Sequence, residues 1–209
     1  IYPIPDLFSD VEAAPLLCAG AIGYRSLSLS GAKNGECIGL TGFGASAHLV
    51  LKMLKSTQPD SDVFVFARNP KERAFALDLG AVWAGDIPDK PPEQLHSVID
   101  TTPVWTPVVH ALKNLLPGGR LVINAIRKEE TDKSILMDLD YPEHLWMEKE
   151  IKSVANVAGI DVDSFLKLAA DIGIRPQVTE FSLDQANEAL MELKQGKIRG
   201  AKVLKVDSH

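Results

Sequence analysis

The sequence predicts an α/β fold in which helices cover both faces of a doubly wound parallel sheet. Two observations support this prediction. Short apolar runs alternate with stretches of helical spacing along most of the 209 residues, and such alternation implies right-handed crossovers between parallel strands. A glycine-rich turn also joins one apolar run to the helix after it, which is typical of a nucleotide-binding sheet.

The first element predicted is a helical segment of small and apolar residues over about 10–29. It precedes the first strand and has no sheet of its own, so we expect it to pack against the rest of the domain. The chain begins at Ile1 rather than Met and has neither the basic start nor the apolar core of a signal peptide. We therefore expect that the natural N-terminus lies further upstream.

The glycine-rich turn follows an apolar run that begins at Cys37 and changes to helical spacing after the glycines. Its register is G-x-G-x-x-A, the pattern of a dinucleotide-binding turn. The first glycine permits a sharp turn, the second lets a pyrophosphate approach the backbone, and the alanine lets helix and strand pack closely. The phosphates would meet the free N–H groups of the next helix. The cofactor-binding residues predicted here are Gly42, Gly44, Ala45, Ser46 and Ala47.

The second buried strand is predicted over Asp62–Phe66. It ends where protein side chains would contact the adenosine ribose of a bound dinucleotide. An acidic residue at this point would bind a free 2′-hydroxyl and repel a 2′-phosphate. The sequence has Ala67 and then Arg68. Because a guanidinium can pair with a phosphate, we predict a preference for NADP(H), with NAD(H) also possible. The alternative interpretation of Arg68 is a solvated cation that starts the next helix.

The later elements continue the alternation, with Pro70 at a helix start and Gly80 after that helix. Asp161 and Ser182 are the expected N-caps of the last two helices. The polar stretch after Arg127 is predicted to be a loop. Helices are predicted over 70–79, 107–116, 161–173 and 182–195, strands over 97–102, 121–126, 151–156 and 201–206, and a turn over 117–120.

Composition and charge exclude several classes of function. The net charge is -6, and no basic patch with interleaved aromatic residues is present, which argues against nucleic-acid binding. No apolar run approaches the ~18 residues of a membrane span. The only cysteines, Cys18 and Cys37, give no disulfide framework and fit a reducing cytoplasm, where we expect the protein.

One stretch carries a family resemblance. Ala14–Gly20, with the sequence APLLCAG, is followed by a helix, by Gly35-Glu36 and by the glycine turn. This arrangement resembles the centre of zinc-dependent alcohol dehydrogenases of the medium-chain dehydrogenase/reductase superfamily, and the resemblance covers essentially the whole chain. It implies that 1–30 ends a catalytic domain, that 31–156 is a Rossmann domain for NAD(P), and that 157–209 returns to the catalytic domain.

The resemblance also implies a metal ligand. Cys18 takes the place of the third protein ligand of the catalytic zinc, an ion that needs three protein ligands and one open position. The other ligands and the proton relay would come from a segment that precedes this chain, so zinc is expected in the full-length protein and not in this fragment. The alternative for Cys18 is a small buried hydrophobe. The histidines lack metal-ligand spacing and are expected on the surface or in helices: His48, His96, His110, His144 and His209.

Further cofactor contacts are implied by the resemblance, and most of them follow predicted strands, where an open parallel sheet places its ligands. An arginine near the C-terminus matches a family arginine that reaches the pyrophosphate, although it could equally be solvated. Family members are commonly dimers or tetramers joined through the edge strand of the cofactor sheet, so a homo-oligomer is expected. The further cofactor-binding residues implied by the resemblance are Thr101, Thr102, Asn124, Ala125, Ile126, Ala155, Asn156 and Arg199.

These observations predict the cofactor-binding portion of a zinc-type alcohol dehydrogenase, which moves a hydride between an alcohol or aldehyde and the nicotinamide. The fragment alone is expected to bind the cofactor at most, and its catalytic residues are unassigned. Two alternatives stay open: a zinc-free quinone or enoyl reductase of the same superfamily, against which Cys18 argues, and a nucleotide-binding Rossmann module without hydride chemistry. A short-chain dehydrogenase would need Tyr-x-x-x-Lys, which no tyrosine provides.

Overall fold

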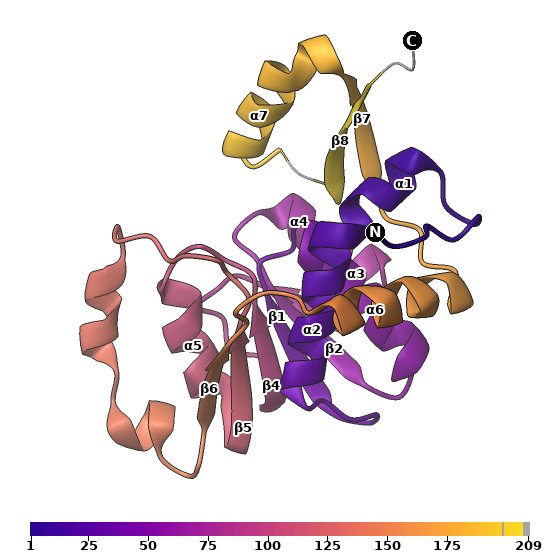
Figure 1. The fold of residues 1–209 in the computed structure, drawn as a ribbon. Helices are drawn as coiled ribbons and strands as arrows, with labels where there is room; N and C mark the ends of the chain where they lie inside the picture. The colour runs from indigo at the N-terminus through magenta and orange to yellow at the C-terminus, as the bar shows by residue number, and fades with distance from the viewer. Residues whose placement is uncertain (198, 207–209) are drawn as a thin grey trace.

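A six-stranded parallel sheet forms the centre of the computed structural model, which describes residues 1–197 and 199–206 (Figure 1). The strand order is β3-β2-β1-β4-β5-β6. This is the order of a Rossmann domain, and it confirms the predicted fold class. The strands are β1 (Cys37–Thr41), β2 (Asp62–Phe66), β3 (Trp83–Gly85), β4 (Leu95–Asp100), β5 (Leu115–Ile123) and β6 (Glu150–Ser153).

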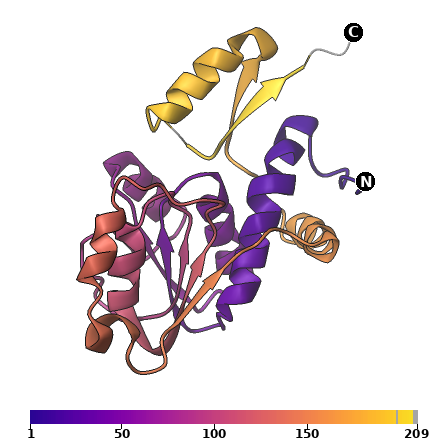
Figure 2. The ribbon, with the colours of Figure 1, turned by 60° about the vertical axis from the view of Figure 1, so that its left-hand side comes forward.

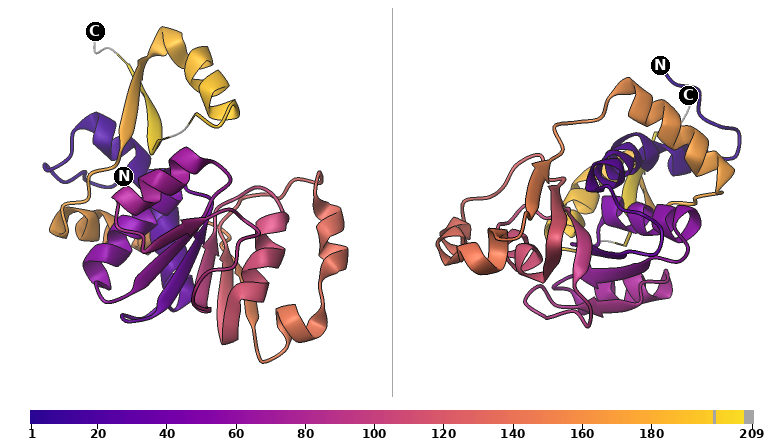
Figure 3. Two further views of the ribbon diagram at one scale, coloured as in Figure 1. Left: turned by 180° about the vertical axis from the view of Figure 1, so that it is seen from behind. Right: turned by 90° about the horizontal axis from the view of Figure 1, so that it is seen from below.

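Helices cover both faces of this sheet (Figure 2, Figure 3). On one face lie α2 (Ala21–Ser30), α3 (Ala45–Thr57) and α4 (Pro70–Asp78), and α5 (Thr106–Asn114) lies on the other. In β2 the side chains of Val63 and Val65 enter the first core, whereas Phe64 and Phe66 enter the second. A strand buried on both faces is apolar at every position, which is why the run reads as continuous rather than alternating.

The predicted N-terminal helix is confirmed, but it is not regular. It comprises α1 (Asp10–Pro15), a π-helical stretch η1 (Leu16–Gly20) and then α2. Pro15 brings no N–H to the helix ladder, and beyond it the N–H of Ala21 reaches back to the carbonyl of Leu16. The helix therefore widens locally, and this wider turn holds Cys18.

Three short elements of the Rossmann part were not predicted. The stretch after Arg127 was expected to be a loop, yet it contains η2 (Lys133–Asp138) and η3 (Tyr141–Leu145). Strand β3 was missed because it has only three residues and two of them are half-buried. The predicted turn at 117–120 is present as a register shift within β5, because Leu95 pairs with Leu115 while Ser97 pairs with Arg120.

The C-terminal part forms one more helix, packed on α2, and then a lobe of its own. Helix α6 (Gly159–Asp171) packs on α2, with the ring of Phe165 fully buried. The lobe consists of β7 (Val178–Ser182), η4 (Leu183–Gln185), α7 (Ala186–Lys194) and β8 (Ala201–Lys205), with β7 parallel to β8 (Figure 1). No helix in the described ranges is long and apolar enough to cross a membrane.

The two expected N-caps differ in outcome. Asp161 is not the N-cap of α6, because that helix begins two residues earlier, after Ala158. The carboxylate of Asp161 instead lies within the first turn and accepts the N–H of Ala158 at 2.7 Å. Ser182 is confirmed as an N-cap, but of the 3-10 turn η4, where the amide oxygen of Gln185 accepts the Ser182 N–H at 3.1 Å.

Candidate cofactor site

The glycine turn between β1 and α3 has the backbone that its sequence predicts. Gly42 has a φ of 76°, and its N–H donates to the carbonyl of Phe66 at 2.8 Å. A Cβ at this position would lie 2.9 Å from side-chain atoms of both Thr101 and Thr102. Conformation and packing therefore both require glycine. At Gly44, by contrast, a Cβ would meet no atom of the described residues within 4 Å, so the backbone faces open space.

Helix α3 begins at this open space. Its N-cap is Gly44, and within the described chain no side chain caps the N–H groups of its first turn, which includes Ala45 and Ser46. Uncapped N–H groups and the positive end of the helix dipole favour an anion. The hydroxyl of Ser46 is directed elsewhere, since it donates to the carbonyl of Ala19 at 2.9 Å. Ala47 is fully buried and permits the close packing that the motif predicts.

A pocket of about 910 Å³ opens beside the turn, at the carboxyl ends of the parallel strands. Of the predicted cofactor residues, it brings together Gly42, Arg68 and Thr102. Arg68 is exposed. The strand end that carries it is held by Arg73, whose guanidinium donates to the carbonyls of Ala67 at 2.7 Å and Arg68 at 3.1 Å. The residues from the other walls include Glu72, Asp86, Val104, Thr131, Asp132 and Gln195.

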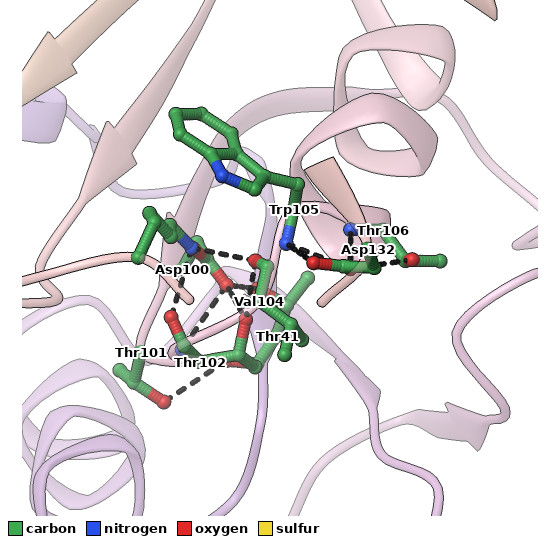
Figure 4. A network of polar contacts seen from close by, with 9 residues as sticks. Thr41, Asp100, Thr101, Thr102, Val104, Trp105, Thr106 and Asp132 are labelled. Carbon is green, nitrogen blue, oxygen red and sulfur yellow. Dashed lines mark hydrogen bonds and ion pairs between the residues drawn. The ribbon is translucent and has the colours of Figure 1, made fainter. Parts of the chain in front are cut away.

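A buried ion pair supports the wall that follows β4 (Figure 4). Asp100 is fully buried and accepts hydrogen bonds from the hydroxyls of Thr41 at 2.6 Å and Thr102 at 2.7 Å. Its second oxygen pairs with the ammonium of Lys128, which also donates to the carbonyls of Thr102 and Val104, both at 2.8 Å. Lys128 thus ties the loop after β5 to the loop after β4, and it fixes two residues that line the pocket.

A second carboxylate holds the same wall at the start of α5 (Figure 4). Asp132 accepts the N–H of Trp105 at 2.9 Å and both the N–H and the hydroxyl of Thr106 at 2.7 Å. Partial burial raises the pKa of Asp132, but these backbone and hydroxyl donors outweigh it and hold the pKa below its ordinary value. The carboxylate therefore stays charged and caps α5 from a distant loop.

Other predicted residues lie outside this pocket. Thr101 donates its hydroxyl to the carbonyl of Thr41 at 2.9 Å. The amide of Asn124 donates to the Ser26 hydroxyl at 2.7 Å, so it ties β5 to α2. The guanidinium of Arg199 lies 4.8 Å from the ring centroid of Phe75 on α4. The residues that follow β5 and β6 also stay predictions: Ala125 is half-buried, and Ile126, Ala155 and Asn156 are exposed.

Cys18 is exposed on η1, so the alternative of a small buried hydrophobe is wrong for this structure. In the part of the chain that the structure describes, no three His, Cys, Asp or Glu residues are grouped closely enough to hold a metal ion. One thiol does not make a zinc site, and the described residues do not fit a complete one.

The histidines occupy varied positions. His48 is fully buried in α3, whereas His96 is exposed on β4. His110 lies in α5 and His144 in η3, while His209 lies outside the described residues. His48 connects the C-terminal lobe to the glycine turn, because its Nε2 accepts the N–H of Gln177 at 3.4 Å and its Nδ1 lies 3.3 Å from the carbonyl of Gly44.

No protein-family model matches the chain. It is similar to the "Probable alcohol dehydrogenase AdhA" of Mycobacterium tuberculosis (strain CDC 1551 / Oshkosh), with 39% identity over 203 residues. The match covers 97% of this chain and 57% of that relative, so the chain spans little more than half of the relative's length.

Two solved structures have a similar fold. One is CAD from Helicobacter pylori complexed with NADP(H), with a TM-score of 0.76 and 22% identity, covering 94% of this chain and 55% of that one. The other is acetophenone reductase from Geotrichum candidum NBRC 4597 in complex with NAD, with a TM-score of 0.80 and 19% identity, covering 97% and 58%. At these identities the likeness concerns the fold alone.

Proposed function

From the premise that this chain is homologous to alcohol dehydrogenases of the medium-chain dehydrogenase/reductase superfamily, we propose that it binds a nicotinamide dinucleotide. The observation that carries the proposal is the uncapped start of α3, which follows a left-handed Gly42 at the edge of a large pocket. The diphosphate would accept hydrogen bonds from the first N–H groups of α3. Arg68, on the wall after β2, would face the adenosine ribose and its 2′-phosphate, which supports NADP(H) with NAD(H) as a second ligand.

Calorimetric titration of this chain with NADPH and NADH tests the proposal. We expect binding of both, tighter for NADPH. Absence of heat with both coenzymes would refute it. A nucleotide-binding module without hydride chemistry would instead bind an adenine nucleotide that lacks the nicotinamide as tightly as the whole coenzyme.

In the complete protein we propose hydride transfer between a small alcohol or aldehyde and the nicotinamide, which the cofactor performs while the protein orients it. Cys18 supplies one ligand of a zinc ion whose other ligands come from outside this chain, and the ion would polarise the substrate oxygen. Metal analysis of the complete protein and of its Cys18→Ala variant tests this assignment. A protein that is active without zinc would favour the quinone or enoyl reductase alternative.

We also propose a homo-oligomer in the cytoplasm. Strand β6 is the edge of the sheet, all four of its residues are exposed, and Ile151 on it is 47% exposed. An edge strand with an exposed apolar side chain favours pairing with another copy. Light scattering of the wild type and of Ile151→Lys tests this, with a shift to monomer expected for the variant.

A further inference from the structure

A carboxylate lies on the pocket wall beside Arg68, at a place where no sequence pattern predicts one. Strand β2 ends at Ala67, so the strand itself offers no acidic group to a ribose. Glu72, in the first turn of α4, lines the same pocket as Gly42 and Arg68. The acidic side chain therefore comes from the helix after the strand and not from the end of the strand.

Glu72 is half-buried on this wall. Burial holds the pKa of Glu72 above its ordinary value, and the positive charge of Arg68 and the backbone N–H of Phe43 offset this only in part. The carboxylate thus lies between a cation and an N–H group of the glycine turn. Of these two groups, Arg68 lines the pocket together with Glu72.

Two other charged side chains near this wall are already engaged by protein groups. The guanidinium of Arg73 is engaged by the carbonyls of Ala67 and Arg68 and lies 3.9 Å from Asp86. Across the pocket, the carboxylate of Asp132 is saturated by the start of α5. Arg68 and Glu72 are opposite charges on one wall that a ligand entering along α4 would meet.

We propose that Glu72 determines coenzyme specificity by accepting hydrogen bonds from the adenosine ribose hydroxyls, the role that Ala67 cannot perform. The inference rests on the proposed dinucleotide binding and refines it. A carboxylate at this point favours a free 2′-hydroxyl and repels a 2′-phosphate, whereas Arg68 acts in the opposite sense. The balance of these two side chains, rather than Arg68 alone, sets the ratio of affinities for NADPH and NADH.

The test is calorimetric titration of the chain with NADH and with NADPH at one pH near 7.5. Glu72→Gln keeps the shape of the side chain and removes its charge, so NADH should bind more weakly and NADPH more tightly. We expect the affinity ratio to shift toward NADPH by about tenfold, the product of two effects of about threefold each, as is usual for partly solvated charges. Arg68→Gln should shift the ratio in the opposite direction.

Two controls accompany this variant. Asp78→Asn removes the same charge from the exposed end of the same helix and should leave the ratio unchanged. Glu72→Asp keeps the charge and should keep the preference close to that of the wild type. Because both affinities are measured on one preparation, a fraction of unfolded protein changes both equally and leaves their ratio intact.

The outcomes separate this inference from the function on which it rests. If the wild type binds the coenzymes but Glu72→Gln leaves their affinity ratio unchanged, Glu72 does not determine specificity, although dinucleotide binding stands. An equal gain in both affinities would also overturn the inference, since it would mean that Glu72 only repels the diphosphate. If the wild type binds neither coenzyme, the proposed function fails as well.

Discussion

Lys128 and Asp100 form an ion pair that is closed off from solvent, with 8% of the lysine side chain and none of the aspartate side chain exposed. The pair joins the loops after β4 and β5, the two crossovers that build one wall of the pocket. A charge removed from such a pair leaves its partner buried and uncompensated, which costs more than the intact pair contributes.

Lys128→Met should therefore lower the free energy of unfolding by about 3 kcal/mol, because Asp100 keeps only hydroxyl and amide donors. Urea denaturation followed by circular dichroism measures this change. Lys133→Met, which removes an exposed lysine paired with Glu130, should cost less than ~1 kcal/mol. The double variant Lys128→Met/Asp100→Asn should regain part of the loss. Equal effects of the two single variants would contradict the structural role of the buried pair.

Gly42→Ala should destabilise the fold and abolish dinucleotide binding, because the new Cβ meets Thr101 and Thr102 and the φ of 76° disfavours any side chain. Gly118→Ala is a matched control. Gly118 has a φ of 71°, but its Cβ would meet no described atom within 4 Å, so only the backbone cost of about 1 kcal/mol applies. Thermal unfolding and coenzyme titration of both variants measure the difference. A Gly118 variant that loses as much stability and coenzyme binding as the Gly42 variant would argue against the packing explanation.

Gly20→Ala should cost about 1–3 kcal/mol, because the added Cβ would lie 2.3 Å from the ring of Phe165 and the core must shift to admit it. This contact joins the π-helical stretch near Cys18 to α6. Phe165→Leu in the same chain should restore part of the stability lost by Gly20→Ala, measured as a coupling free energy in a double-mutant cycle. Strict additivity of the two substitutions would show that the ring and the glycine do not interact.

The sequence predicts those parts of this molecule that depend on neighbouring residues. The glycine turn and the continuous apolar runs such as Val63–Phe66 are local signals, and the structure contains both. Short or half-exposed strands leave a weaker signal: β7, with one buried residue in five, was not predicted. The predicted strands extend past the observed strand ends, because the polar residues that follow, such as Thr101, belong to the loops.

Side chains that act across loops leave no local pattern at all. Lys128 reaches Asp100 over a separation of 28 residues, and Asp132 caps a helix 26 residues before it. Glu72 looks like an ordinary first-turn acid until the fold places it beside the glycine turn. Asn124 and Arg199, carried over by resemblance, contact protein groups in this structure, and their roles toward a cofactor stay predictions.

His48 gives the chain a pH dependence whose sign follows from its environment. Burial lowers the pKa of His48 to about 4, from an ordinary value of 6.5, although the carbonyl of Gly44 partly favours the charged form. The unfolded chain therefore binds a proton before the folded chain does. The stabilisation is complete above pH 6.5 and is lost as the pH falls from there toward 4, by about 3 kcal/mol in all.

His48→Gln should flatten this dependence, since glutamine can still accept the N–H of Gln177 but does not titrate. Urea denaturation at pH 7 and at pH 4.5 measures the difference for each protein. His96→Gln, an exposed histidine on β4, should leave the slope close to that of the wild type. Because the variant and the wild type share every other titrating group, an unchanged slope in His48→Gln would mean that His48 carries a proton in the folded state.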